Sequence, residues 1–200
     1  MEIKNLKKTA KSYGVPIIRT ESHKLLESEV IKSKPTHILE IGTAIGFSGI
    51  TMLSASEADL TTIEHNKDYI KQAKNNFKSH KLSKRVKIIE GDCLVILANM
   101  VSSKKYDNYF DFVFLDGPKA QYDNMLDLIM NLLKPNGTFV ADNVLFRGYV
   151  DGENKPVSRR YKTIIERLNK FIEKCKNHPK LTDFILNNIE DGMIFAKKRG

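Results

Sequence analysis

The stretch Ile38-Leu39-Glu40-Ile41-Gly42-Thr43-Ala44-Ile45-Gly46-Phe47-Ser48 decides the fold class of this chain. It has the pattern of an apolar strand that ends in a carboxylate and enters a turn hinged by two glycines. Glycine permits backbone geometry and close ligand approach that a side chain would block. The spacing is Glu-x-Gly-x-x-x-Gly, not the Gly-x-Gly-x-x-Gly of dinucleotide-binding folds. The stretch therefore favours S-adenosylmethionine over a nicotinamide cofactor and makes a dehydrogenase the weaker alternative.

On both sides of this stretch, strand-like and helix-like segments alternate, which predicts an α/β fold with a mostly parallel sheet between helices. Parallel strands are expected at residues 37–41, 60–64, 86–90, 110–116 and 138–141. Helices are expected at residues 21–31, 47–54, 66–77, 93–100, 122–133 and 160–175. Thr20 is expected to cap the first of these helices, and Pro135 and Gly137 to stop the fifth. The last two segments, 181–186 and 193–197, predict an antiparallel hairpin that completes a seven-stranded sheet.

Length and composition limit the possible classes of protein. A chain of 200 residues, 41% hydrophobic and 28% charged, fits one domain spanning 1–200. The sequence has neither a signal peptide pattern nor an apolar run that could span a membrane, so we expect a cytoplasmic protein. The two cysteines, Cys93 and Cys175, lack metal-ligand spacing, so we expect free thiols. The net charge of +9 is compatible with an RNA partner or with a merely lysine-rich composition.

Polar side chains lie at or just after the carboxyl end of each of the five predicted parallel strands. They are Glu40, Glu64, Asp92, Asp116 and the pair Asp142-Asn143. In open α/β sheets ligands bind beyond the carboxyl ends of the strands, and an acid about 20 residues after the glycine turn is placed to bind ribose hydroxyls. Each residue alone could be a turn former or helix cap. Their common position predicts a cofactor site.

Two neighbouring strand ends supply a set of oxygen ligands. Asp116, Asp142 and Asn143 carry carboxylate and amide oxygens, which suit a hard cation such as Mg²⁺. The sequence has no Cys/His cluster for zinc. A cation on a hydroxyl oxygen would lower its pKa, and Lys119 is positioned to take the proton or to stabilise the oxyanion. We therefore expect Asp116 and Lys119 to be catalytic.

These motifs resemble the class I S-adenosylmethionine-dependent methyltransferases, and more closely the cation-dependent O-methyltransferases that include the catechol and caffeoyl-CoA enzymes. The resemblance covers nearly the whole chain and implies a Rossmann-like fold, Lys119 as the base and, as in many relatives, a homodimer. The cofactor-binding residues that it implies are Ile18, Glu40, Gly42, Thr43, Gly46, Ser48, Glu64, His65, Asp92, Cys93 and Asp116. The metal ligands would be Asp116, Asp142 and Asn143.

The segment after the predicted metal ligands is expected to line the acceptor site through Phe146, Arg147 and Tyr149. It looks most like the bacterial branch that methylates 5-hydroxyuridine at the tRNA wobble position. Candidate phosphate contacts on that interpretation are Arg159, Arg160, Lys162, Lys7, Lys8 and Lys11. Two alternatives stay open: the same enzyme acting on a small catechol-like or phenolic substrate, and a non-catalytic protein that binds the cofactor or RNA.

Overall fold

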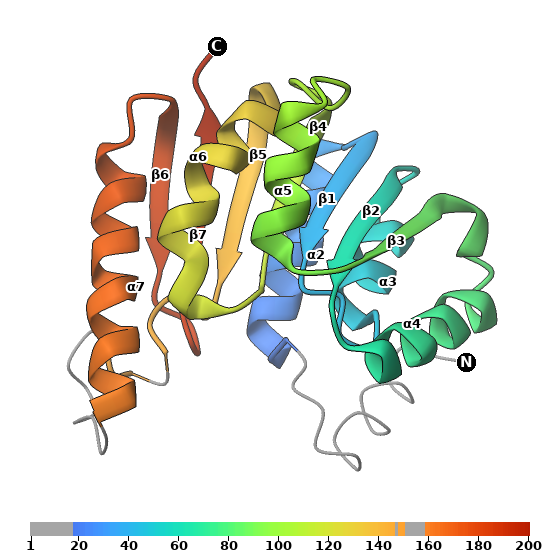
Figure 1. The fold of residues 1–200 in the computed structure, drawn as a ribbon, viewed down its shortest axis with the longest axis horizontal. Helices are drawn as coiled ribbons and strands as arrows, with labels where there is room; N and C mark the ends of the chain where they lie inside the picture. Colours follow the sequence, from blue (N-terminus) through green and yellow to red (C-terminus); the bar gives the residue numbers. More distant parts are fainter. Residues whose placement is uncertain (1–17, 147, 151–158) are drawn as a thin grey trace.

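A seven-stranded sheet runs through the centre of the molecule (Figure 1). The computed structural model describes residues 18–146, 148–150 and 159–200. The strands are β1 His37–Ile41, β2 Asp59–Glu64, β3 Val86–Glu90, β4 Phe110–Leu115, β5 Leu133–Asp142, β6 Leu181–Asn187 and β7 Met193–Lys198. Their order across the sheet is β3-β2-β1-β4-β5-β7-β6. Strands β1 to β5 pair in parallel, and β7 pairs antiparallel with both β5 and β6, as the sequence predicted.

Helices cover both faces of the sheet and form two apolar cores with it. They are α2 Thr20–Ser33, α3 Phe47–Ser54, α4 Lys67–Ser79, α5 Cys93–Ser102, α6 Tyr122–Leu132 and α7 Arg159–Asn177, with short 3₁₀ turns at η1 Ser83–Arg85 and η2 Lys119–Gln121. Helices α5, α6 and α7 pack on one face, where Leu97, Leu126 and Phe171 are buried. Helices α2, α3 and α4 contribute Leu26, Ile50 and Phe77 to the other core. Among the described helices, none combines the length and apolarity needed to cross a membrane.

Two local expectations are wrong. The residue at the N-cap of α2 is Arg19 rather than Thr20, and its side chain makes no capping hydrogen bond. Helix α6 ends at Leu132, and β5 begins at the next residue and runs through Pro135. The register between β4 and β5 shifts near this proline, as expected for a residue that lacks a backbone N–H and is tolerated at bulges. The predicted strand at 138–141 is therefore only the regular part of β5.

The register of the central strands brings their carboxyl ends level with one another. Ile41 on β1 pairs with Ile63 on β2 and with Leu115 on β4, and Leu115 pairs with Ala141 on β5. The strand order reverses between β1 and β4, and ligands in such sheets bind at this switch point. The parallel strands all end at the lower side of the molecule in Figure 1. The polar residues that follow them consequently lie along one edge.

Gly42 is the residue on which this arrangement places the strictest demand. Its φ is +101°, and a Cβ atom there would lie 2.2 Å from the carbonyl oxygen of Asp116. The first turn after β1 therefore packs directly against the end of β4. No other amino acid fits without moving one of the two strand ends.

We expect Gly42→Ala to lower the free energy of unfolding by about 2–4 kcal/mol, because it adds a left-handed alanine and a clash with rigid backbone. Gly117→Ala is the control, since its Cβ would lie 3.1 Å from a methyl group of Ile41 and its φ is not positive. Urea denaturation of both variants measures the difference. Equal losses at the two positions would contradict the proposed role of the backbone contact.

Candidate active site

A cavity of about 640 Å³ opens beyond the carboxyl ends of β1 to β4. It lies at the switch point of the sheet, where the fold places ligand sites. The predicted site residues that line it are Ile18, Gly42, Thr43, Ser48, Glu64, His65, Asp92, Cys93, Asp116, Lys119 and Asn143. The structure thus brings most of the predicted cofactor, metal and catalytic residues to one space.

The remaining predicted residues lie elsewhere. Glu40 and Asp142 are fully buried and do not line the cavity, and Gly46 is the N-cap residue of α3. Phe146 and Tyr149 form an aromatic cluster with Tyr161, with ring centroids 5.4–5.8 Å apart. The prediction for Arg147 falls outside the described residues. The candidate substrate side chains that the structure describes therefore pack with one another in the segment that follows the cavity-lining residue Asn143.

Glu64 organises the rim of the cavity. Its Oε2 atom accepts a hydrogen bond from the backbone N–H of Ala44 at 3.0 Å. Its Oε1 atom accepts hydrogen bonds from the backbone N–H groups of His65 and Asn66, each at 2.9 Å. The same carboxylate thus fixes the glycine turn after β1 and the start of the β2–α4 connection. Since the side chain lies at the cavity wall, it can also accept hydrogen bonds from a ligand hydroxyl.

Glu40 lies behind the turn and holds it from the interior. Its two oxygens accept hydrogen bonds from the hydroxyls of Ser48 at 2.5 Å and Thr62 at 2.6 Å. Thr43 extends this network through its hydroxyl, 2.6 Å from that of Thr62. Burial raises the pKa of Glu40, and the hydrogen bonds from the two hydroxyls lower it. The net pKa is about 7, above the ordinary value for a glutamate. The residue therefore supports Ser48 and Thr43, which themselves face the cavity.

Asp116 and Lys119, which also line the cavity, form an ion pair. The Nζ atom of Lys119 lies 2.7 Å from Oδ1 of Asp116 and donates to the Tyr122 hydroxyl at 3.1 Å. Burial lowers the pKa of Lys119, but the negative charge of Asp116 and the hydrogen bonds to Asp116 and Tyr122 outweigh burial and raise the pKa above its ordinary value. The Lys119 side chain is therefore an ammonium in this arrangement, which suits it to stabilise negative charge.

Asp142 presents an unusual buried carboxylate. Its Oδ1 atom accepts a hydrogen bond from the backbone N–H of Asn143 at 2.7 Å, whereas Oδ2 is buried with no hydrogen-bond partner among the described residues. Burial raises the pKa of Asp142, and the negative charge of Asp116 raises it further. Two carboxylates that repel each other beside an amide side chain have the chemistry of a hard-cation site.

Asp92 and Cys93 occupy the end of the cavity next to β3. Asp92 lines the cavity and also caps α5, where its Oδ1 atom accepts hydrogen bonds from the backbone of Leu94 and Val95. The Cys93 thiol lies 3.6 Å from the side-chain oxygen of Gln121. Burial and the charge of Asp92 raise the pKa of this thiol, which keeps it neutral.

Sequence reasoning missed several residues of the site. Gln121 and Tyr69 line the cavity, and Tyr161 completes the aromatic cluster of Phe146 and Tyr149. Gln121 comes five residues after Asp116, and Tyr69 lies in the first turn of a helix that begins beside Glu64. Their closeness to Asp116 and Glu64 in the sequence could have identified Gln121 and Tyr69. Tyr161 lies in α7, and its contact with Phe146 and Tyr149 depends on how that helix packs, which no local sequence pattern indicates.

A Glu40→Gln substitution is expected to alter the pH dependence of stability. Between pH 4.5 and 7 the folded protein keeps a proton on Glu40 that the unfolded chain has lost, so wild-type stability falls as pH rises. A glutamine side chain does not titrate, so the variant should gain on the order of 3 kcal/mol relative to wild type from pH 5 to pH 8. Urea denaturation across this range measures the gain. Glu57→Gln is an exposed control, and parallel pH profiles for wild type and Glu40→Gln would refute the titration.

Comparison with known proteins agrees with this geometry. The model of the O-methyltransferase family matches residues 2–199. A catechol O-methyltransferase from Niastella koreensis is 30% identical over 145 residues, which cover 70% of this chain and 65% of that protein. A caffeoyl-CoA O-methyltransferase from Stellaria longipes is 24% identical over 74% of this chain and 63% of the other. The chain spans between about half and two thirds of the length of the curated relatives that it matches.

Solved structures share the whole architecture. A candidate caffeoyl-CoA O-methyltransferase from Staphylococcus aureus superposes with a TM-score of 0.89 and 31% identity, over 99% of this chain and 92% of that one. An O-methyltransferase from Bacillus cereus, solved with SAH, has the same fold with a TM-score of 0.82 and 23% identity, over 98% and 90% of the two chains. With a family match over almost every residue and the strand-end acids gathered at one cavity, this chain belongs to the O-methyltransferase family.

Proposed function

We propose that this protein transfers a methyl group from S-adenosylmethionine to a hydroxyl oxygen of its acceptor. The observation that carries this proposal is the single cavity in which Asp116, Lys119 and Asn143 face the same space as Glu64 and the glycine turn. In the reaction the acceptor hydroxyl releases its proton to water, its oxygen attacks the methyl carbon, the carbon–sulfur bond breaks, and sulfur keeps the electron pair. Such a transfer requires the sulfonium and the acceptor oxygen to be held together in one enclosed space.

The cofactor would lie across the ends of β1, β2 and β3. Glu64 would accept hydrogen bonds from the ribose hydroxyls, and Asp92 and Cys93 would border the adenine ring. The turn from Gly42 to Ala44 and the side chain of Ser48 would surround the amino-acid end, and Ile18 would close the cavity from the N-terminal side. Structural neighbours solved with SAH and with SAM support this use of the fold.

Asp116, Asp142 and Asn143 would hold a hard divalent cation such as Mg²⁺. Asp116 directly follows β4, Asp142 ends β5 and Asn143 follows it, and these two strands pair in register about 4.8 Å apart. The Oδ2 atom of Asp142, which has no partner among the described residues, and the repulsion between the carboxylates of Asp142 and Asp116 would be compensated by a hard cation held by these residues. When bound, the cation lowers the pKa of an acceptor hydroxyl and fixes its direction. Lys119, held as an ammonium by Asp116, would stabilise the acceptor oxyanion.

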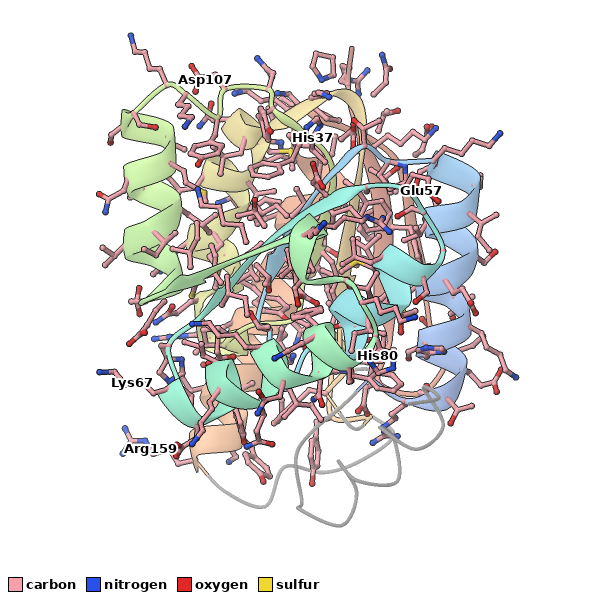
Figure 2. All side chains as sticks on the ribbon, turned by 90° about the vertical axis from the view of Figure 1, so that its right-hand side faces the viewer. His37, Glu57, Lys67, His80, Asp107 and Arg159 are labelled. Carbon is pink, nitrogen blue, oxygen red and sulfur yellow. The ribbon has the colours of Figure 1, made fainter. Side chains whose placement is uncertain are left out.

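We further propose 5-hydroxyuridine at the tRNA wobble position as the acceptor. Support comes from the outer face of α4, where Lys67, Lys71, Lys74 and Lys78 recur every three or four residues and are exposed. Lys67 pairs with Glu90 at 3.7 Å, whereas the other three form no ion pair with described residues. Figure 2 places Lys67 and Arg159 at the same end of the molecule, and α4 also contributes Tyr69 to the cavity. This face would bind the phosphate backbone.

A small catechol-like acceptor is the second candidate. The cluster of Phe146, Tyr149 and Tyr161 offers ring faces and edges to a flat substrate, and it follows Asn143 closely in the chain. The relatives named catechol and caffeoyl-CoA O-methyltransferases also favour this acceptor class. Both acceptors present a hydroxyl oxygen beside a second oxygen, so either would suit the same cation site.

The methyl-transfer reaction is tested by replacing Asp142 with alanine. We expect turnover to fall at least about 100-fold, because the cation would lose a ligand whose charge stabilises the reacting oxygen. The dissociation constant for S-adenosylhomocysteine should stay within about twofold, since Asp142 does not line the cavity. Chelation by EDTA should abolish wild-type turnover, and added Mg²⁺ should restore it. Full activity in EDTA would contradict the role of the cation.

The acceptor is tested with a synthetic anticodon stem-loop that carries 5-hydroxyuridine, and with catechol. Mass spectrometry of the products should detect 5-methoxyuridine, whereas methylation of catechol alone would establish the second candidate. The variant Lys71→Ala/Lys74→Ala should bind the stem-loop more weakly and reduce the slope of log K against log salt concentration by about 1.4, or about 0.7 per lost contact. Lys105→Ala/Lys176→Ala is the matched control, and an equal change in both variants would contradict a role for α4.

A further inference from the structure

The β6–β7 turn, residues 188–192, is packed against the segment that follows the proposed metal ligands. The backbone N–H of Leu145 donates to the carbonyl of Asp191 at 2.8 Å, and that of Val144 donates to the carbonyl of Gly192 at 3.1 Å. Gly192 has a φ of +74°, and a Cβ atom there would lie within 2.4 Å of Cγ of Leu145. The turn therefore fixes the chain directly after Asn143.

The same turn also holds the start of α2. Oε2 of Glu190 accepts hydrogen bonds from both the backbone N–H and the hydroxyl of Ser22, each at 2.9 Å. Nε of Arg19 lies 3.0 Å from Oδ2 of Asp191. Since the Arg19 side chain makes no capping bond, the carboxylate of Glu190 does the work of a cap from 168 residues away. A negative charge at this end of the helix also interacts favourably with the helix dipole.

These contacts connect two walls of the proposed active site. Ile18 is adjacent to Arg19, is buried, and lines the cofactor cavity. Asn143, which lines the same cavity, is adjacent to the segment that Asp191 and Gly192 hold. The turn is thus bound at one side to the N-terminal wall of the cavity and at the other to the end of β5.

We propose that Glu190 and Asp191 are positioning residues that hold Ile18 against the bound cofactor. Neither residue lines the cavity, so both act through the start of α2. Glu190 has a φ of +56°, which is unfavourable for a residue with a side chain and is held by the contacts of its carboxylate at the helix end. The inference rests on the proposed use of the cavity for S-adenosylmethionine. It adds that the β6–β7 turn fixes the position of Ile18 at the N-terminal side of the cavity.

The first test compares Glu190→Ala with Glu190→Gln. Alanine removes both bonds to Ser22, so the dissociation constant for S-adenosylhomocysteine, measured by calorimetry, should rise about fivefold, the factor that ~1 kcal/mol of lost capping would produce. Glutamine keeps an acceptor oxygen and should restore most of the affinity. The KM for S-adenosylmethionine should rise in parallel, with kcat at saturating cofactor nearly unchanged. Glu57→Ala removes an exposed acid, which Figure 2 shows away from Lys67 and Arg159, and is the matched control.

The second test exchanges the charges of Arg19 and Asp191. Arg19→Asp and Asp191→Arg should each weaken binding of S-adenosylhomocysteine, and the double variant should recover part of the loss. If the largely buried Asp191 does not tolerate arginine, Arg19→Gln provides the same measurement at the more exposed partner.

The outcomes separate this inference from the proposed function. A wild-type protein that does not bind S-adenosylhomocysteine would overturn the function on which the inference rests. If wild type binds it, dissociation constants within twofold of wild type for both Glu190→Ala and Arg19→Gln would overturn the inference alone. A lower melting temperature in Glu190→Ala with unchanged affinity would assign the turn a structural role only, which also contradicts the proposal.

Discussion

The contact between the backbone of Gly42 and the carbonyl of Asp116 is the constraint on which the site depends. It joins β1 to β4 at the point where the strand order reverses, so the turn proposed to bind the cofactor and the strand end proposed to bind the metal and acceptor share one boundary. Methyl transfer requires two ligands in line at short range. Without a Cβ atom at position 42, the first turn after β1 can approach the end of β4 closely enough to bring the two ligands together. Any larger residue at position 42 would clash with the Asp116 carbonyl.

Two buried carboxylates give the site its electrostatic character, and their surroundings assign them different roles. Glu40 is satisfied by two hydroxyls and supports the cofactor turn from below. Asp142 keeps one oxygen without a described partner beside the charge of Asp116. Burying a charge is costly unless it is paired or hydrogen-bonded. The first carboxylate meets that requirement within the protein, whereas the proposed cation would meet it for the second.

Much of the fold and the cavity could be predicted because their signals are local. Strand periodicity, the glycine turn and the acids at strand ends located β1 to β5 and several cavity-lining residues, and the family resemblance implied others, such as Ile18 and Ser48. The sequence could not show that Glu40 points into the core rather than the cavity, because both orientations suit an acid at the end of an apolar strand. Nor could it show that β5 runs through Pro135, since the register shift depends on pairing with β4. The cap on α2 was missed for the same reason: Glu190 acts across 168 residues.

The placement of β7 between β5 and β6 has a consequence for how the protein is made. Among the strands that the structure describes, β6 joins the sheet through β7 alone, and β7 follows β6 in the chain. During synthesis from the N-terminus, the edge of β5 lacks its partner β7 until that strand has been made, and the start of α2 lacks the carboxylate of Glu190 until shortly before then. Contacts of such sequence separation slow folding. The nascent chain therefore exposes an unpaired strand edge from the synthesis of β5 until that of β7, the period in which a chaperone would protect it.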